Sequence, residues 1–503
     1  MTKEKKNLLT AAVIITVVYA GTLWQRPMFS PAEYDFAIAS MSSATDFAAL
    51  LNGLFGKAMG FNIVSVRLLC AVSSIICALI VRYITAKESN GNTGNIAGVI
   101  YLSTLLTYAT GSSCSPIAIQ TLFFTCFAAS LYAFFEYAKS SKTAYLLAAG
   151  AGCSAGFFSI SAAGYTAFYL PLAVAAGYAF AKKISKSIPL LGAGAFFAAA
   201  IIFIWQKKSG LSAMPQPVEF HITDLLCIAG LLPWVLFAPQ AVTGWKNSFF
   251  KSNIAIMMLF ITAATILTLP VWGVPATLAL ASPFAVIVFA LGLSKTAGNE
   301  KAVRISEKTL NIFSLLLLTA AIFILIINLG SNWQFIQKLV FRKFIHLPKA
   351  ELAGFAVAIA VALIHYKIAC DEKASLPGKK LLYVASGTAV LMMLLPGALF
   401  SGIKLAYVPD EFFVRTLKMY TAPDSALYAD KECINTVRWV MKDKKVTLIT
   451  REKLPELAKQ VQNGNAAVIS TNYEFTKLLP KSKMLFVRGK WRIVIFHNSA
   501  RSF

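Results

Sequence analysis

Charge is scarce in this sequence, and acidic charge is the scarcest. Only 14% of the 503 residues are charged and 57% are hydrophobic, whereas soluble domains carry roughly 25% charged residues. This deficit excludes an ordinary soluble protein and indicates a chain that folds in lipid. The 47 Lys and Arg residues outnumber the 22 Asp and Glu residues. In a soluble protein that excess would indicate nucleic-acid binding, but these cations lie in short loops between apolar runs, so we expect no nucleic-acid partner.

Paired cysteines are lacking as well. The sequence has 8 Cys residues, but no two of them form a CxxC pair. Most of them lie inside apolar runs, where a thiol behaves as a small hydrophobic group. The cysteines therefore indicate neither a disulfide framework nor a zinc site.

Apolar runs long enough to cross a bilayer recur over residues 1–403. A spanning helix needs about 20 largely apolar residues, and we expect about 13 spans. We expect the first of them to be a retained anchor rather than a cleaved signal peptide. The fold class predicted for this region is mainly α, a polytopic transmembrane helical protein. The runs lie near 8–23, 63–85, 96–110, 117–138, 143–159, 163–180, 187–205, 222–242, 253–270, 274–293, 309–329, 350–369 and 380–402.

The distribution of basic residues predicts how these spans are oriented in the membrane. Cytoplasmic loops carry the excess of Lys and Arg, and alternate loops of this chain are rich in them. The predicted inner loops hold, for example, Arg82 and Lys87, Lys139 and Lys142, and Lys295 with Lys301. This pattern predicts a cytoplasmic N-terminus and places residues 404–503 on the outer side of the membrane, in the periplasm of a Gram-negative cell.

From about residue 404 the composition changes to that of a soluble α/β module. Strand-like runs alternate with polar helical stretches at 431–442 and 454–462, a pattern typical of a small βαβ sheet. No glycine-rich phosphate loop or catalytic cluster is evident here, so we expect a binding or supporting domain. The strand-like runs lie at 446–449, 466–470, 484–488 and 491–497.

Ionisable residues are almost absent from the spans. Glu136 lies near the inner end of one predicted span and Arg67 at the outer start of another. An ion-coupled transporter would carry charges at mid-membrane, so that class is disfavoured. The first outer loop, 24–62, is expected to form interfacial helices and contains Glu33, Asp35 and Asp46. A carboxylate there can act as a base or help to hold a divalent metal, although a solvated carboxylate is the commoner explanation.

A family pattern favours the catalytic interpretation. The run at 26–39, RPMFSPAEYDFAIA, followed by Leu54-Phe55-Gly56 and Val66-Arg67-Leu68, resembles the opening of the bacterial aminoarabinose transferases. These are class-C glycosyltransferases related to the protein O-mannosyltransferases. Further matches occur in order along the chain, at 99–103 (VIYLS), 232–234 (LPW), 244–247 (GWKN), 426–430 (ALYAD) and 437–440 (VRWV).

The resemblance implies a class-C fold and a defined reaction. A sugar would pass from a polyprenyl-phosphate carrier to lipid A or a comparable envelope acceptor, at the outer face of the bacterial inner membrane and in contact with membrane lipids. Glu33 is the expected base or metal ligand, with Asp35 second, and Arg67 is expected to make a structural or phosphate contact. No cofactor is certain, and a divalent metal remains open. The other candidate carrier-binding cations are Lys57, Lys207 and Lys208.

Several family positions are altered. Ala32 follows Pro31 where the family has an acid, and Ser115 precedes Pro116 where the family has Asp. Family lysines are replaced in the segments 161–164 (SAAG) and 272–275 (WGVP). Several cations around a phosphate are worth a few kcal/mol each in a dry site, so their joint loss would weaken carrier binding. Two hypotheses remain: an active glycosyltransferase, or an inactive relative that binds a lipid or a partner protein.

Overall fold

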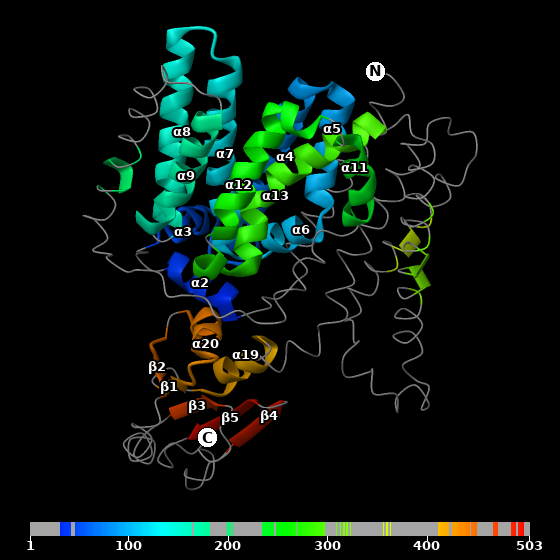
Figure 1. Cartoon of the computed structure of the whole chain (residues 1–503). Helices are drawn as coiled ribbons and strands as arrows, with labels where there is room; N and C mark the ends of the chain where they lie inside the picture. The colour runs from blue at the N-terminus through cyan, green and yellow to red at the C-terminus, as the bar shows by residue number, and fades with distance from the viewer. Residues whose placement is uncertain are drawn as a thin grey trace. The chain divides into compact units, whose positions relative to one another are not determined.

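The computed structural model describes two compact units of the chain (Figure 1). One is helical and is built mainly from residues 43–326; the other combines residues 26–42 with the C-terminal region from 397 on. The described ranges are 31–41, 46–162, 165–181, 234–245, 248–267, 269–296, 411–421, 425–442, 444–449, 466–470, 484–488 and 491–496, with isolated positions at 198–204, 308–322 and 356–363.

The helical unit is a bundle with a continuous apolar core. Helix α4 packs against α5 and α7, α7 against α8, and α11 and α12 against α13. Its largest fully buried side chains are aromatic, among them Phe124, Tyr132, Phe158 and Phe284. The elements are α3 (Phe47–Met59), α4 (Ile63–Glu88), α5 (Gly91–Ser103), α6 (Leu105–Ser112), α7 (Pro116–Tyr137), α8 (Ser141–Ser161), α9 (Tyr165–Ala181), η2 (Trp234–Phe237), α11 (Ala238–Trp245), η3 (Phe249–Lys251), α12 (Asn253–Leu267) and α13 (Leu269–Thr296).

Four described helices are long and apolar enough to cross a membrane. They are Ile63–Glu88, Pro116–Tyr137, Ser141–Ser161 and Gly273–Lys295, and each coincides with a run predicted from the sequence. Shorter apolar helices occupy Phe47–Met59, Tyr169–Phe180 and Asn253–Thr265. The polytopic helical class is therefore confirmed. The predicted count of about 13 spans includes runs at 8–23, 187–205, 222–242, 309–329, 350–369 and 380–402, which lie wholly or mostly outside the described residues.

Two predicted spans differ in detail from the structure. The run near 96–110 is divided into α5 and α6 at Thr104, whose ψ of 137° is extended. The Thr104 hydroxyl donates to the Tyr101 carbonyl at 2.9 Å, a local bond that competes with the helical ladder. In α13 the chain bends at Gly273, whose φ of 72° is left-handed and suits glycine.

The second unit is a small α/β structure that includes a helix from far upstream. The sheet order is β2-β1-β3-β5-β4, with β1 parallel to β2 and β3, and β5 antiparallel to β3 and β4. All five residues of β3 are buried, as expected for a central strand. Helix α2 packs against α20. The elements are α2 (Pro31–Met41), α19 (Glu411–Tyr420), β1 (Ala426–Ala429), α20 (Ile434–Met441), β2 (Val446–Leu448), β3 (Ala466–Ser470), β4 (Met484–Arg488) and β5 (Trp491–Phe496).

The predicted C-terminal α/β fold is confirmed. Strands β2 to β5 coincide with the four predicted runs to within one residue at each end, and α20 lies inside the predicted helix 431–442. Strand β1 was not predicted, because its four residues ALYA are too short to show an alternating pattern. The predicted helix 454–462 lies outside the described residues, and the domain boundary at 403/404 stays a prediction.

Candidate functional site

Helix α2 carries the two acids singled out by the sequence. Pro31 is its first residue, where the missing N–H and the fixed φ of proline suit a helix start. Glu33 lies in the first turn, where the positive end of the helix dipole stabilises a carboxylate. The sequence therefore builds a helix that begins with a stabilised acid.

The two acids of α2 point to different surroundings. Glu33 is buried, with 4% of its surface exposed, and it shares a face with the buried Phe36, Ala37 and Ser40. Asp35 is exposed. Residues two apart on a helix do not face each other. Glu33 and Asp35 are therefore not a carboxylate pair acting on one atom.

Asp35 has a partner in the C-terminal region. Its Oδ1 accepts a hydrogen bond of 2.6 Å from Nδ2 of Asn435, in the first turn of α20. The two residues lie 400 positions apart, so this bond ties the first predicted outer segment to the α/β unit. The geometry gives Asp35 a positioning role, because its carboxylate is used to hold α2 against α20.

A metal site would need several ligands to converge. Among the described residues, no group of three or more His, Cys, Asp or Glu side chains is arranged to hold a metal ion. Glu33 is buried and Asp35 is exposed, which disfavours one ion shared by these two carboxylates. A divalent metal thus stays an untested prediction.

The predicted cations lie in several places. Arg67 is in the helical unit, near the N-terminus of α4, and its side chain is fully buried. Burial keeps this guanidinium away from solvent, which favours the structural one of its two predicted roles. Lys57, in the last turn of α3, is exposed. Lys207 and Lys208 lie outside the described residues.

Polar groups gather around the start of α4 in the helical unit. Nδ2 of the buried Asn52 on α3 lies 3.8 Å from the Cys114 sulfur, and the Cys70 thiol donates to the Ser115 carbonyl at 3.2 Å. Ser115 also caps α7, its hydroxyl accepting from the Ile117 N–H at 3.3 Å. At the position where the resemblance predicts Asp, this chain therefore has a serine that caps α7 and carries no carboxylate.

Asp46 is a third acid, and the structure gives it a defined role. Its carboxylate caps α3, accepting from the Ala48 N–H at 2.9 Å. Burial raises the pKa of this carboxyl to about 6, against the lowering effect of the backbone hydrogen bonds from Ala48 and Ala49. An Asp directly before the apolar run 47–51 is a helix-start signal, but the sequence alone does not reveal that the carboxyl is partly buried.

Comparisons with known proteins show what the sequence and the fold are similar to. Residues 46–205 match the model of the dolichyl-phosphate-mannose-protein mannosyltransferase family. The crystal structure of ArnT from Cupriavidus metallidurans in the apo state matches with a TM-score of 0.76 and 14% identity, over 98% of each chain. The ArnT structure bound to undecaprenyl phosphate matches with a TM-score of 0.76 and 13% identity, again over 98% of each chain. No curated protein matches the sequence.

These matches define a class. With four helices suited to crossing a membrane, the chain is a membrane protein with the class-C glycosyltransferase fold. Within that class the likeness covers nearly the whole of the ArnT chain, so the predicted resemblance to the aminoarabinose transferases is confirmed at the level of the fold.

Proposed function

We propose that this chain transfers a sugar from a polyprenyl-phosphate carrier to a lipid A-like or other envelope acceptor at the outer face of the bacterial inner membrane. The observation that carries the proposal is the buried Glu33 in the first turn of α2, within a fold shared over 98% of the chain with an ArnT that binds undecaprenyl phosphate. A single carboxylate is sufficient for this chemistry, because an inverting transfer needs one base.

The proposed step uses Glu33 as that base. An acceptor oxygen attacks the anomeric carbon while its proton passes to the Glu33 carboxylate. The bond between the anomeric carbon and the carrier phosphate breaks, and the polyprenyl phosphate leaves with the electron pair. Burial keeps water from the carboxylate and strengthens its interaction with the developing charge. In this scheme Asp35 supports the reaction by holding α2 through Asn435.

Carrier binding would depend on cations that offset the leaving phosphate. Arg67 is fully buried, and we assign it to the stability of the helical unit. Lys57, Lys207 and Lys208 remain the candidates for phosphate contact, and the exposed Lys57 side chain is open to a ligand.

A second function is favoured by specific substitutions. Ala32 and Ser115 occupy positions where the resembling family has acids, and Ser115 caps α7 through its hydroxyl. A non-catalytic relative that binds a lipid or a partner protein would keep such structural roles and lose the carboxylates.

One set of variants separates the two functions. Glu33→Gln preserves size and polarity but removes the base, and Glu432→Gln changes an exposed acid of the same unit. The full chain and each variant are produced in cells that lack the native copy, and the envelope lipids are compared by mass spectrometry. Loss of a general base lowers the rate by about 100-fold or more.

The proposal predicts a sugar-mass increment that requires Glu33. The increment should disappear with Glu33→Gln, remain with Glu432→Gln, and decrease with Asp35→Asn, which weakens the contact to Asn435. If cells with and without the chain show the same lipid masses, the transfer reaction is refuted and the non-catalytic function is favoured.

A further inference from the structure

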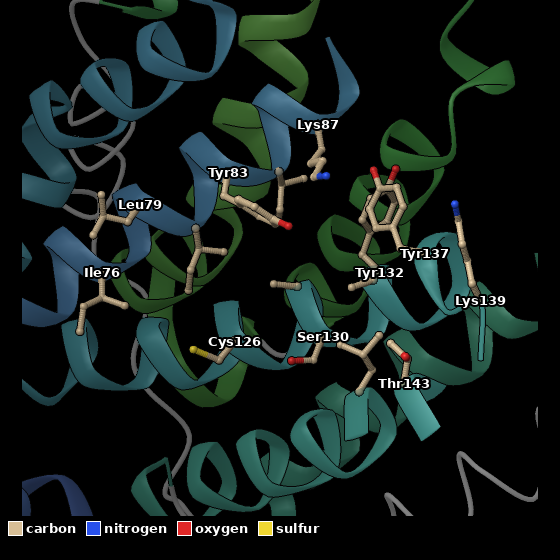
Figure 2. Close-up of a pocket in the computed structure, with 15 residues that line it drawn as sticks. Ile76, Leu79, Tyr83, Lys87, Cys126, Ser130, Tyr132, Tyr137, Lys139 and Thr143 are labelled. Atoms are coloured by element: carbon tan, nitrogen blue, oxygen red, sulfur yellow. The ribbon is translucent and has the colours of Figure 1, made fainter. Parts of the chain in front are cut away.

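An apolar groove opens on the helical unit between α4, α7 and the start of α8 (Figure 2). Its volume is about 760 Å³. Three of its lining side chains, Ile76, Leu79 and Tyr83, are exposed. The groove is therefore a surface feature of the unit, distinct from the acids of α2 in the other unit.

The lining residues form one stripe on each of two helices. On α4 they run from Ile76 to Lys87, and on α7 from Cys126 to Tyr137. Each stripe covers eleven residue steps, which is about 16 Å of helix at 1.5 Å per residue. One leaflet contributes half of the roughly 30 Å hydrocarbon core. The apolar stripes therefore match the depth of a single leaflet.

Positive charge lies at one end of the groove only. Figure 2 shows Lys87, Tyr137 and Lys139 toward one end, and Ile76 and Leu79 toward the other. Lys87 and Lys139 are both exposed, and they lie where α4 and α7 end. By the distribution of basic loops, this end is predicted to face the cytoplasm, where anionic lipids attract Lys and Arg near the membrane surface.

Two tyrosines at this end of the groove, Tyr132 and Tyr137, are held in place by Glu88. The Glu88 Oε1 atom accepts hydrogen bonds from the hydroxyls of Tyr132, at 2.7 Å, and Tyr137, at 2.5 Å. Both rings line the groove, so Glu88 fixes their positions. A second acid, Glu136, lies at the same end. Both carboxylates are engaged by side-chain hydrogen bonds, and the charged side chains that line the groove are Lys87 and Lys139.

We propose that this groove binds an anionic diacyl phospholipid of the cytoplasmic leaflet. The acyl chains would lie along the apolar stripes of α4 and α7, and the phosphate would lie between Lys87 and Lys139. Charge complementarity selects an anionic headgroup, and the match to one leaflet selects a membrane lipid over a long polyprenyl chain. The site is independent of the sugar-transfer proposal.

The test measures lipid retention by the full-length protein. The protein is equilibrated with vesicles that contain equal amounts of phosphatidylglycerol and phosphatidylcholine with identical acyl chains, and the retained lipids are counted by native mass spectrometry. The key variant is Lys87→Gln with Lys139→Gln. The matched control is Lys142→Gln, an exposed lysine in the first turn of α8 that does not line the groove.

The wild-type protein should retain phosphatidylglycerol in preference to phosphatidylcholine. The double variant should reduce this preference by roughly 30-fold, the effect of removing two lysines near a membrane surface, while Lys142→Gln should leave it unchanged. Both lysines of the double variant are exposed, so its thermal unfolding midpoint should equal that of the wild type. Equal retention of the two lipids, an equal loss with Lys142→Gln, or a second protein chain or polyprenyl phosphate in place of phospholipid would overturn the proposal.

Discussion

The two ends of α4 and α7 use charge in different ways. At the end where α4 begins, Arg67 is a fully buried cation. At the end where both helices finish, Glu88 and Glu136 each accept two side-chain hydrogen bonds. Glu88 is bound by two tyrosines, and Glu136 accepts from the Tyr178 hydroxyl at 2.9 Å and from Nδ2 of Asn253 at 2.6 Å.

This contrast shows how to interpret a charge in a membrane bundle. The donors to Glu136 come from α9 and α12, so one carboxylate on α7 links three helices. An acid whose acceptors are occupied by tyrosine and asparagine stabilises packing and is poorly placed to move protons. Glu136, at the end of α7, thus has a structural role, and the candidates for catalysis are the acids outside the spans.

The largest expected effect is at Arg67. Arg67→Met keeps the length of the side chain and removes a fully buried charge together with its polar contacts. We expect the free energy of unfolding to fall by about 3 to 5 kcal/mol, measured by chemical denaturation in detergent micelles. Lys57→Met, at an exposed site, should change it by less than about 0.5 kcal/mol. Equal stability of the two variants would refute the structural assignment of Arg67.

The next effect tests the link between α7 and α12. Glu136→Ala leaves the Tyr178 hydroxyl and the Asn253 amide without their acceptor, and should lower the free energy of unfolding by about 2 to 3 kcal/mol. A double-mutant cycle with Asn253→Ala isolates the contact, and its coupling free energy should be on the order of 1 kcal/mol. Strict additivity of the two single changes would show that the contact contributes nothing to stability.

A smaller effect is expected at the tyrosines that hold Glu88. Tyr132 is 1% exposed and Tyr137 is 40% exposed, although both donate to the same carboxylate oxygen. Tyr132→Phe should therefore lower the free energy of unfolding by about 1 kcal/mol, and Tyr137→Phe by less, because water replaces its hydrogen bond. The same denaturation experiment checks the order, and a larger loss at Tyr137 would contradict it.

Much of the fold follows from the sequence because its signals are local. Runs such as 63–85 and 117–138 are long and apolar, and α4 and α7 occupy them. The break at Thr104 was not predicted, because it depends on a hydroxyl bonding to its own backbone within an otherwise apolar run. Helix α2 was expected at the membrane surface with the first outer loop. Its packing against α20 is a long-range contact that no window of sequence contains.

The candidate site is less predictable, because it depends on long-range contacts. The sequence identifies Glu33 and Asp35 as acids after Pro31, and helical geometry then implies that they lie on different faces. Which of the two is buried depends on the whole unit, as does the hydrogen bond of Asp35 to Asn435. The groove at Lys87 and Lys139 was not predicted either, because its lining residues come from three helices whose packing the sequence does not specify.

The last prediction concerns Asp46, where the ordinary value of 3.8 rises to a pKa of about 6 through burial. Since the folded state binds the proton more tightly than the unfolded state, this group favours folding most below pH 3.8, and its contribution declines as the pH rises to about 6. Asp46→Asn keeps a capping oxygen and removes the partly buried charge. The variant should match the wild type at pH 4 and exceed it at pH 7 by on the order of 1 kcal/mol, measured by denaturation at both pH values. A variant that is less stable at pH 7 would show that the cap needs the negative charge at the start of α3.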